Sequence, residues 1–436
     1  MYGTIVPRGS RVLEVGCGEG DLLASVKPSY GVGIDFSPEM VALARARHPD
    51  LSFIEADAHD FEMSDSFDYI VLSDLVNDVW DVQRIISRVS HMATSDTRIV
   101  LNFYNRLWES PLRAAATFGF ARRSLLQNWL TESDVEGFLR LCGLEVVRNW
   151  TEIIALTNLA GLGRLANQYL ARAWPVRKVA LTNFVVARTV APQSLPALPT
   201  VSVIVAARNE AGNIEALLER VPDMGAATDI VFVEGHSTDD TYETIARLIA
   251  NEPPGRCQLF RQNGTGKGDA VRMGLSQAKG DILMILDADL TVPPEDLPRF
   301  YDALISGAGE FINGVRLVYP METEAMRSLN LFGNRLFSLA FTWILDQPIR
   351  DTLCGTKVLW KSDYEKIAAN REYFGDFDPF GDYDLLFGAA KLNLSIAEVP
   401  IRYRERVYGS TNISRWRHGW LLLRMVAFAA RRIKFV

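Results

Sequence analysis

Apolar runs of strand length alternate with amphipathic stretches along most of this chain of 436 residues, and one proline-rich segment interrupts the pattern. Because a parallel strand is reached through a helical crossover, this alternation favours doubly wound α/β sheets. The interruption, "VAPQSLPALPT" at 190–200, has three prolines and little periodicity, which is typical of a linker. We therefore predict two α/β domains, at 1–190 and 201–436, joined by a linker at 191–200.

The expected strands follow from short runs rich in β-branched residues. In the first domain they are 11–16, 31–35, 51–57, 67–73, 97–104, 144–150 and 183–189. In the second domain they are 201–207, 229–235, 257–262, 281–289 and 311–317. The end of the chain, from residue 416 on, is expected to form a basic amphipathic helix.

Composition excludes several classes of protein. The net charge of −7 argues against a general nucleic-acid binder, whose surface would be basic. No run of eighteen apolar residues occurs, so we predict no membrane-spanning helix. The cysteines show no CxxC spacing and no secretory leader is evident, so we expect free thiols in the cytoplasm. These cysteines are Cys17, Cys142, Cys257 and Cys354.

The stretch "LEVGCGEGDLL" runs from a strand through glycines into a helix. Glycines let the backbone approach a ligand closely, and the helix N-terminus offers free N–H groups. The spacing Gly16-x-Gly18-x-Gly20 is not that of a dinucleotide fingerprint, because residue 21 is Asp21. Asp35 ends the next strand, where a carboxylate can accept both hydroxyls of a ribose.

These motifs, over residues 10–190, resemble those of class I S-adenosylmethionine-dependent methyltransferases and occur in the same order. The resemblance implies S-adenosylmethionine as the cofactor. It assigns Asp35 to the ribose of the cofactor, and Asp57 and Ala58 to its adenine. Ser73 and Asp74 would line the site after the fourth strand. The residues assigned to the methionine end are Glu14, Gly16, Gly18 and Gly20. Family members usually have helices before the first strand, whereas here only about ten residues precede it. This departure leaves two alternatives: an open cofactor pocket, or further residues that precede Met1.

The methyl acceptor is not defined by these motifs. Aromatic and amide side chains at or after the fifth strand could hold a polar acceptor or could serve packing alone. They are Asn102, Tyr104, Asn105, Trp108, Asn128 and Trp129. The alternative is a cofactor-binding regulatory or scaffold domain without catalysis.

In the second domain, polar residues follow three strands at the edge where ligands of open α/β sheets bind. Arg208 and Glu210 follow the first strand, Glu234 ends the second, and "GDILMILDADL" places Asp287 and Asp289 where a buried strand emerges. Two carboxylates so close repel each other, so they either lie on a solvated loop or hold a compensating cation. Mg²⁺ or Mn²⁺ shared with substrate phosphates would suit them. Sugar transfer from a nucleotide sugar uses such a cation, because the diphosphate leaves with added charge.

Glycines surround Lys267 in "NGTGKGDAVRMGL", which suits a cation placed beside phosphates. The stretch is not the phosphate-binding loop of nucleotide triphosphatases, because Gly268 stands where that loop has a hydroxyl residue.

Residues 201 to about 415 resemble family 2 glycosyltransferases of the A-type fold, and dolichyl-phosphate mannosyl- and glucosyltransferases in particular. The motifs are "VSVIVAARNE", "VEGHSTDDT", "GKGDAVRMGL", "DILMILDADL", "RDTLCGTKVL" and "AEVPIRYRERVYGSTN". The resemblance assigns two residues to the metal, Asp289 with Asp287, and one residue, Arg406, to phosphates. It assigns three residues to the acceptor: Asp351, Gly355 and Lys357. The residues assigned to the nucleotide sugar are Ala207, Arg208, Glu210, Glu234, Lys267 and Asp287.

Three positions depart from the family pattern. Glu234 replaces an aspartate, which implies a change in the nucleotide base accepted. Ala206 replaces a proline, and Asn412 replaces a lysine, which removes one cation expected near a phosphate.

The stretch "GDFDPFGDYDLL" holds the candidate general base. A phosphomonoester is largely anionic near neutrality, its second pKa being about 6, so it hardly needs a base. A sugar hydroxyl does need one. We predict Asp382 or Asp384 as this base; the alternative is an acidic loop or a support for the metal site.

Two segments bear on membrane contact. Arg417, Arg424 and Arg431 recur every seven residues on an otherwise apolar segment, a pattern that suits an anionic lipid interface. In the segment 329–346, Asn334, Ser338 and Thr342 form a thin polar stripe on a mostly apolar helix. Both segments could instead pack on the protein core.

The resulting prediction is a fused, cytoplasmic enzyme with an optional peripheral membrane contact. It would combine methyl transfer with metal-dependent, inverting sugar transfer to a polyprenyl phosphate or related lipid. The alternative is a glycosyltransferase for a soluble or polysaccharide acceptor, with a non-catalytic first domain.

Overall fold

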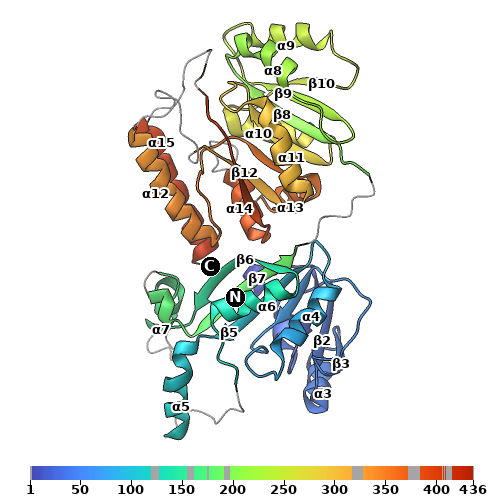
Figure 1. Cartoon of the computed structure of the whole chain (residues 1–436), viewed down its shortest axis with the longest axis vertical. Coiled ribbons are helices and arrows are strands. Elements are labelled where there is room, and N and C mark those ends of the chain that lie inside the picture. The colour runs from blue at the N-terminus through green and yellow to red at the C-terminus, as the bar shows by residue number, and fades with distance from the viewer. Residues whose placement is uncertain are drawn as a thin grey trace. The chain divides into compact units, whose positions relative to one another are not determined.

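The computed structural model describes residues 2–118, 127–154, 162–173, 176–190, 197–316, 328–371, 383–404, 406, 408 and 415–435. The chain divides into two compact units, Met1–Ala191 with Lys434–Val436, and Pro192–Ile433. Residues 191–196 of the predicted linker lie outside the described residues. Each unit is built on its own sheet, so the two are described in turn (Figure 1).

The first unit has a seven-stranded sheet in the order β3-β2-β1-β4-β5-β7-β6. β7 is antiparallel to its neighbours and the other strands are parallel. The strands are β1 (Arg11–Val15), β2 (Tyr30–Asp35), β3 (Ser52–Glu55), β4 (Tyr69–Leu72), β5 (Arg98–Tyr104), β6 (Leu144–Glu152) and β7 (Thr182–Thr189). Strand order reverses between β1 and β4, and ligands bind at such a switch point.

The second unit also has a seven-stranded sheet, in the order β10-β9-β8-β11-β13-β12-β14. β13 is antiparallel to β11 and β12, and the other pairs are parallel. The strands are β8 (Val201–Ala207), β9 (Thr228–Glu234), β10 (Cys257–Arg261), β11 (Ile282–Asp287), β12 (Phe311–Val315), β13 (Lys357–Trp360) and β14 (Ile396–Pro400). Here the order reverses between β8 and β11.

The two sheets confirm the prediction of two doubly wound α/β units, with β13 and β14 added to the expected strands. The helices of the first unit are α1 (Tyr2–Ile5), α2 (Asp21–Ser25), α3 (Pro38–Arg47), α4 (Val82–Met92), α5 (Glu109–Thr117), α6 (Glu132–Leu141) and α7 (Leu162–Leu165). Those of the second are α8 (Ile214–Arg220), α9 (Thr241–Ile249), α10 (Lys267–Gln277), α11 (Leu297–Ile305), α12 (Ser328–Leu345), α13 (Lys361–Ala369), α14 (Tyr383–Lys391) and α15 (Arg415–Ala429).

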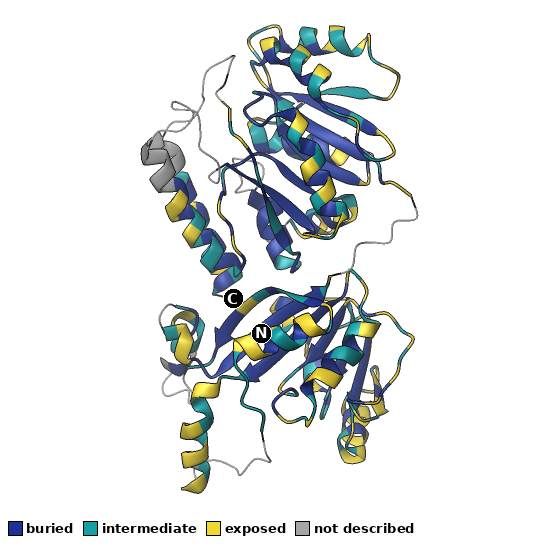
Figure 2. Cartoon of the chain, in the orientation of Figure 1, coloured by how far each residue is buried: buried dark blue, intermediate teal, exposed yellow. Residues whose placement is uncertain are grey.

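Apolar residues on both faces of the central strands bury the sheets between helix layers, whereas the edge strands β3 and β10 are more exposed (Figure 2). In β8, Val203 and Val205 pack with residues of α8, α9 and α11, whereas Ile204 packs on the other side with residues of α10, α12 and α14. Successive strand residues point to opposite faces, so a continuous β-branched run fills both cores. This burial fixes the strand ends, where the polar residues lie.

Helix α12 turns its polar stripe toward the interior of the second unit. Asn334 donates to Asp351 Oδ1 at 3.0 Å, and Ser338 and Thr342 donate to the Ile349 carbonyl. The polar stripe therefore faces the protein, while Leu339 on α12 is 70% exposed. No helix in the described part of the chain is long and apolar enough to span a membrane.

We predict that Gly225→Ala destabilises the second unit strongly. Gly225 has φ +61°, and a Cβ there would overlap the Pro199 carbonyl oxygen, which is backbone and cannot rotate away. The expected loss in the free energy of unfolding is about 3 kcal/mol, from strain and clash together. Hydrogen exchange of the β8 peptide in rising urea measures this loss in the full chain.

Gly255→Ala is the matched control, because Gly255 also has positive φ (+89°) but nothing lies within 4 Å of its added Cβ. It should lose only the strain, about 1–2 kcal/mol. Equal losses in both variants would contradict the clash with Pro199.

Candidate functional sites

The glycine loop after β1 opens a space at the switch point of the first sheet. Gly16, Gly18 and Gly20 have φ of 78°, 49° and 79°, values that other residues rarely adopt. A Cβ at Gly16 or Gly20 would press on Leu75 or Phe53, whereas one at Gly18 would meet nothing within 4 Å. The loop is thus packed at both ends and open in the middle, where a ligand can approach the backbone.

Asp35 lies across this loop from the end of β2. Its carboxylate accepts from the Gly18 N–H at 2.8 Å and from the Ser37 N–H at 2.9 Å. The side chain is half-buried, so it orders the loop and still reaches the open space. The position of Asp35 beside the glycine loop is compatible with the predicted contact with a ribose, which stays a prediction.

Glu14, the residue before Val15 in β1, is the least satisfied group of the site. It is 2% exposed, and its Oε2 has no hydrogen-bond partner among the described residues. Burial raises the pKa of the Glu14 carboxyl to about 8, which the backbone N–H of Leu23 opposes and the charge of Asp35 increases. A buried carboxyl with one unused oxygen fits the cationic methionine part of S-adenosylmethionine.

A polar cluster covers the ends of β4 and β5. Asn102 accepts from the Tyr2 hydroxyl at 2.6 Å and from the Asp74 N–H at 3.0 Å, and its amide donates to Asp74 Oδ1. Ser73, predicted to line the site, is half-buried and hydrogen-bonds Tyr2. Burial raises the pKa of the Asp74 carboxyl. Sequence patterns carry no signal for Tyr2, because α1, which holds it, is one turn long.

Asp57 and Ala58, predicted for the adenine, follow β3. Asp57 is exposed, and its Oδ1 accepts from the His59 N–H at 2.8 Å and lies 2.7 Å from His59 Nδ1. His59 is buried and stacks on Trp80, with ring centroids 4.7 Å apart. Sequence reasoning missed His59 and Trp80, which flank the predicted adenine residues.

Several of the candidate acceptor residues serve the fold. Asn105 and Trp108 donate to the carbonyls of residues 178 and 179, and the Asn128 amide donates to the carbonyls of residues 76 and 79. Tyr104 and Trp129 instead face each other, with centroids 6.3 Å apart. Of the six, Asn102, Tyr104 and Trp129 therefore stay candidates for an acceptor.

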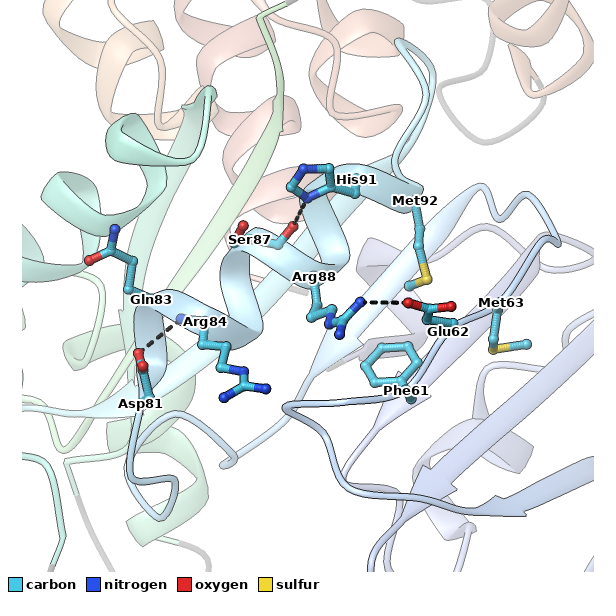
Figure 3. A pocket seen from close by; sticks show the side chains of 10 residues that line it. All are labelled: Phe61, Glu62, Met63, Asp81, Gln83, Arg84, Ser87, Arg88, His91 and Met92. Atoms are coloured by element: carbon cyan, nitrogen blue, oxygen red, sulfur yellow. Dashed lines mark hydrogen bonds and ion pairs between the residues drawn. The ribbon is translucent and has the colours of Figure 1, made fainter.

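A shallow pocket in the first unit lies apart from these residues. Figure 3 shows it between α4 and segment 61–63, with Arg84, Arg88 and Glu62 among its lining side chains. Arg88 pairs with Glu62 at 3.2 Å, and Arg84 pairs with Asp60. Since these arginines are already neutralised, we assign the pocket no ligand.

In the second unit, Asp287 ends β11 and pairs with a lysine of α10. Lys267 Nζ lies 2.6 Å from Asp287 Oδ1. Burial alone would raise the pKa of the Asp287 carboxyl, but the charges of Lys267, Lys357 and Arg316 lower it below its ordinary value. The carboxylate is therefore ionised and surrounded by cations.

Asp289 belongs to a second, connected ion-pair network. Arg406 Nη2 lies 2.7 Å from Asp289 Oδ2, and Arg406 Nη1 lies 3.3 Å from Glu210 Oε1. Asp289 Oδ1 accepts from the Thr291 hydroxyl at 2.7 Å. One guanidinium thus joins the ends of β8 and β11, two strands that the sequence places far apart.

Glu210 is buried beside this network. Burial raises the pKa of its carboxyl to about 7, which Arg406 and the Asn213 amide oppose and the charges of Asp289 and Asp287 increase. Asn213 donates to Glu210 Oε2 at 2.6 Å. Burial therefore favours the neutral form of Glu210, and the Arg406 guanidinium favours its ionised form.

Of the predicted acceptor residues, Gly355 lies directly against Asp287. A Cβ at Gly355 would overlap Asp287 Oδ2, so only glycine allows this close approach. Lys357 is 1% exposed and donates to the Cys354 carbonyl. Asp351 is fully buried and forms a bidentate pair with Arg316, at 2.7 and 2.8 Å. That pair holds the pKa of Asp351 well below its usual range despite burial.

The remaining donor residues end β8 and β9. Ala207 is buried and its carbonyl accepts from the Gly235 N–H, whereas Arg208 is exposed. Glu234 is buried and accepts from the Ser237 N–H at 2.5 Å. These residues line the same sheet edge as Asp287.

The candidate bases are only partly described. Asp384 lies in the first turn of α14 and is 6% exposed, and its Oδ2 lies 3.3 Å from Arg371 Nε. Its neighbours in that network include Tyr364, whose hydroxyl pKa is raised by burial. Asp382 and Asn412 lie outside the described residues.

Among the described residues, no group of three or more His, Cys, Asp or Glu is placed to hold a metal ion. Two carboxylates at one strand end, both compensated by cations, nevertheless fit an oxygen-bound cation whose other ligands come from substrate phosphates.

The chain matches two family models. "Glycosyl transferase family 2" covers residues 202–368, and "Methyltransferase domain" covers residues 12–95. The chain is 30% identical over 206 residues to a dolichyl-phosphate hexose transferase of Haloferax volcanii, covering 46% of this chain and 80% of that protein. It is 29% identical over 230 residues to glycosyltransferase AglJ of the same organism, covering 52% and 71%.

Further relatives match the second unit or the first. An undecaprenyl-phosphate 4-deoxy-4-formamido-L-arabinose transferase of Pseudomonas aeruginosa is 26% identical over 221 residues, covering 50% of this chain and 61% of that protein. A methyltransferase structure from Mesorhizobium loti is 19% identical with a TM-score of 0.34, covering 42% and 91%. Glucosyl-3-phosphoglycerate synthase of Mycobacterium tuberculosis is 19% identical with a TM-score of 0.40, covering 54% and 80%.

We predict that S-adenosylmethionine binds more tightly as the pH rises toward about 8, the pKa of Glu14. Below that pH the carboxyl is protonated, and a cationic ligand favours its ionised form. The affinity should rise by up to about tenfold per pH unit and level off above the pKa. Isothermal titration at several pH values measures this slope.

Glu14→Gln should remove the dependence of S-adenosylmethionine affinity on pH. Asp96→Asn, at an exposed site, should keep this dependence. The same slope in wild type and Glu14→Gln would contradict the assignment of Glu14.

Proposed function

The chain belongs to glycosyltransferase family 2 and carries a methyltransferase domain, and we propose that its second unit transfers a sugar from a nucleotide sugar to a polyprenyl phosphate. The observation that carries this proposal is the pair Asp287 and Asp289 at the end of β11, each facing a protein cation. On binding, a divalent cation would take the place of the two protein cations beside the aspartates, and the diphosphate would become the new partner of those protein cations. The total charge of the site would stay balanced. The relatives named for dolichyl- and undecaprenyl-phosphate transfer support the acceptor class.

The proposed reaction is an in-line displacement. A phosphate oxygen of the acceptor attacks the anomeric carbon, the bond to the diphosphate breaks, and the nucleoside diphosphate leaves with the electron pair. Lys267 and Arg406 would bind the diphosphate as its charge grows. A divalent cation held by Asp287, Asp289 and the diphosphate would offset the same charge.

The surroundings of Asp384 favour a phosphate acceptor over a hydroxyl. Asp384 is buried and ion-paired with Arg371, so acting as a base would require breaking that pair. An anionic phosphate needs no such base. The second candidate function, transfer to a soluble or polysaccharide hydroxyl, would depend on Asp384 or Asp382.

For the first unit we propose S-adenosylmethionine-dependent methyl transfer to an acceptor at the ends of β4 and β5. Glu14 would hold the methionine part, Asp35 the ribose, and Asp57 with Ala58 the adenine. Asn102, Tyr104 and Trp129 would bound the acceptor. The unsatisfied oxygen of Glu14 supports this proposal. The alternative, a non-catalytic cofactor-binding domain, would bind the cofactor without transferring its methyl group.

We also propose that the α12–α15 face contacts an anionic membrane on its cytoplasmic side. Leu336, Leu339, Trp420 and Leu423 are 53%, 70%, 66% and 48% exposed, and Arg424, which follows Leu423 on α15, is also exposed. Apolar side chains next to arginines suit a lipid interface.

We predict metal-dependent transfer of sugar label into the organic phase when the protein is mixed with polyprenyl phosphate and labelled nucleotide sugars. Asp289→Ala should reduce this label about a hundredfold, because charge stabilisation of the leaving group is lost. Asp384→Asn should keep the label within a few-fold. Loss of label in Asp384→Asn with nucleotide binding intact would contradict the argument that transfer to a phosphate needs no base, and no organic label in any protein would exclude the lipid phosphate.

We predict that the protein sediments with phosphatidylglycerol vesicles and that the double variant Leu339→Ser, Trp420→Ser lowers vesicle affinity about tenfold or more. Each large apolar side chain contributes about 1.5–3 kcal/mol when buried. Leu141→Ser, which removes a leucine 72% exposed on α6, is the control and should bind as wild type. Equal binding of all three proteins would refute the proposed face.

A further inference from the structure

Both carboxylates of the Asp287–Asp289 pair are already engaged by side chains of this chain. Asp287 Oδ1 faces Lys267 Nζ at 2.6 Å, and Asp289 Oδ2 faces Arg406 Nη2 at 2.7 Å. The other oxygen of Asp289 accepts from Thr291. A divalent cation cannot bind Asp289 through Oδ2 until the guanidinium moves.

Arg406 makes a second contact that the motif did not suggest. Its Nη1 lies 3.3 Å from Glu210 Oε1, so one guanidinium spans two carboxylates. Glu210 and Asp289 are 8% and 14% exposed at their side chains, which limits compensation by solvent. Close, poorly solvated carboxylates repel strongly without a counter-ion. Arg406 therefore supplies the positive charge that offsets the repulsion between Glu210 and Asp289.

We infer that Arg406 is the resident counter-ion of the donor site, that it keeps a lone divalent cation out, and that it leaves Asp289 when a nucleoside diphosphate arrives to bind it. The metal and the nucleotide then bind together rather than independently. This inference rests on the proposed function for the identity of the diphosphate.

The exchange is chemically balanced. Guanidinium groups bind phosphate oxygens with two parallel hydrogen bonds, as they bind carboxylates. When Arg406 turns from Asp289 to a diphosphate, a divalent cation can take its place and share the same phosphate oxygens. The nucleotide supplies the negative charge that both cations need. Without the nucleotide, the cation would have to displace Arg406 with no new partner for the guanidinium.

The test measures Mn²⁺ binding directly, from the loss of the paramagnetic resonance signal of free Mn²⁺. The full-length protein is titrated with Mn²⁺ alone, with Mn²⁺ and UDP, and with Mn²⁺ and GDP. Arg406→Gln removes the guanidinium, and Arg406→Lys keeps its charge. Arg404→Gln changes an exposed arginine two positions away, with the same loss of charge. Asp289→Asn reports binding elsewhere on the chain.

The wild type should bind Mn²⁺ weakly alone and more tightly with one of the nucleotides. Arg406→Gln should bind Mn²⁺ alone about tenfold more tightly than wild type, the factor expected for removing one charge-assisted contact. Arg406→Lys and Arg404→Gln should behave as wild type. Asp289→Asn should lose the nucleotide-dependent binding.

Two results of the titration would overturn the inference. One is a wild type that binds Mn²⁺ equally well with and without nucleotide. The other is an Arg406→Gln protein whose affinity for Mn²⁺ alone is unchanged or lower while Arg406→Lys is folded and normal.

Sugar transfer is measured separately, so that the two proposals can fail independently. If no lipid is labelled but the Mn²⁺ pattern holds, the proposed acceptor fails and the role of Arg406 stands. If lipid is labelled but no Mn²⁺ binds under any condition, the role of Arg406 fails and the proposed acceptor stands.

Discussion

The buried pair between Arg316 and Asp351 is the interaction on which the second unit's donor site depends. Arg316 follows β12, and Asp351 lies before β13. Asp351 also accepts from Asn334 of α12 and from the Leu353 N–H, so every oxygen of this buried carboxylate is satisfied. A buried pair is costly to break, because either partner left alone would be an uncompensated charge. This pair fixes the segment that brings Gly355 against Asp287.

The two units accommodate buried carboxyl groups in different ways. Each presents carboxyl groups at the carboxyl ends of parallel strands, where the sheet order reverses. In the first unit, burial raises the pKa of Glu14 and leaves one of its oxygens without a hydrogen-bond partner, so a cationic ligand would favour its ionised form. In the second unit Asp287 and Asp289 lie beside protein cations that a ligand can replace. Burial without a partner favours the neutral acid, and burial beside a cation favours the charged one.

Sequence patterns predicted the long parallel strands and the residues at their ends, because a β-branched run followed by polar residues has a local signature. They did not predict β13 and β14, which are short and are held by neighbours distant in sequence. The contact of Arg406 with Asp289 spans 117 positions and has no local signal. The orientation of α12 was equally hidden, since the partners of Asn334 come from the segment after the helix.

That orientation has a mechanical consequence. Asn334 holds Asp351 from α12 while Arg316 holds it from β12. The helix therefore cannot roll about its own axis without taking a hydrogen bond from a buried carboxylate. The outward direction of Leu339 is set in this way by the electrostatics of the interior. A displacement of α12 by a force on its outer face would therefore also displace Asp351. Through Asp351 it would shift the segment that holds Gly355 against Asp287.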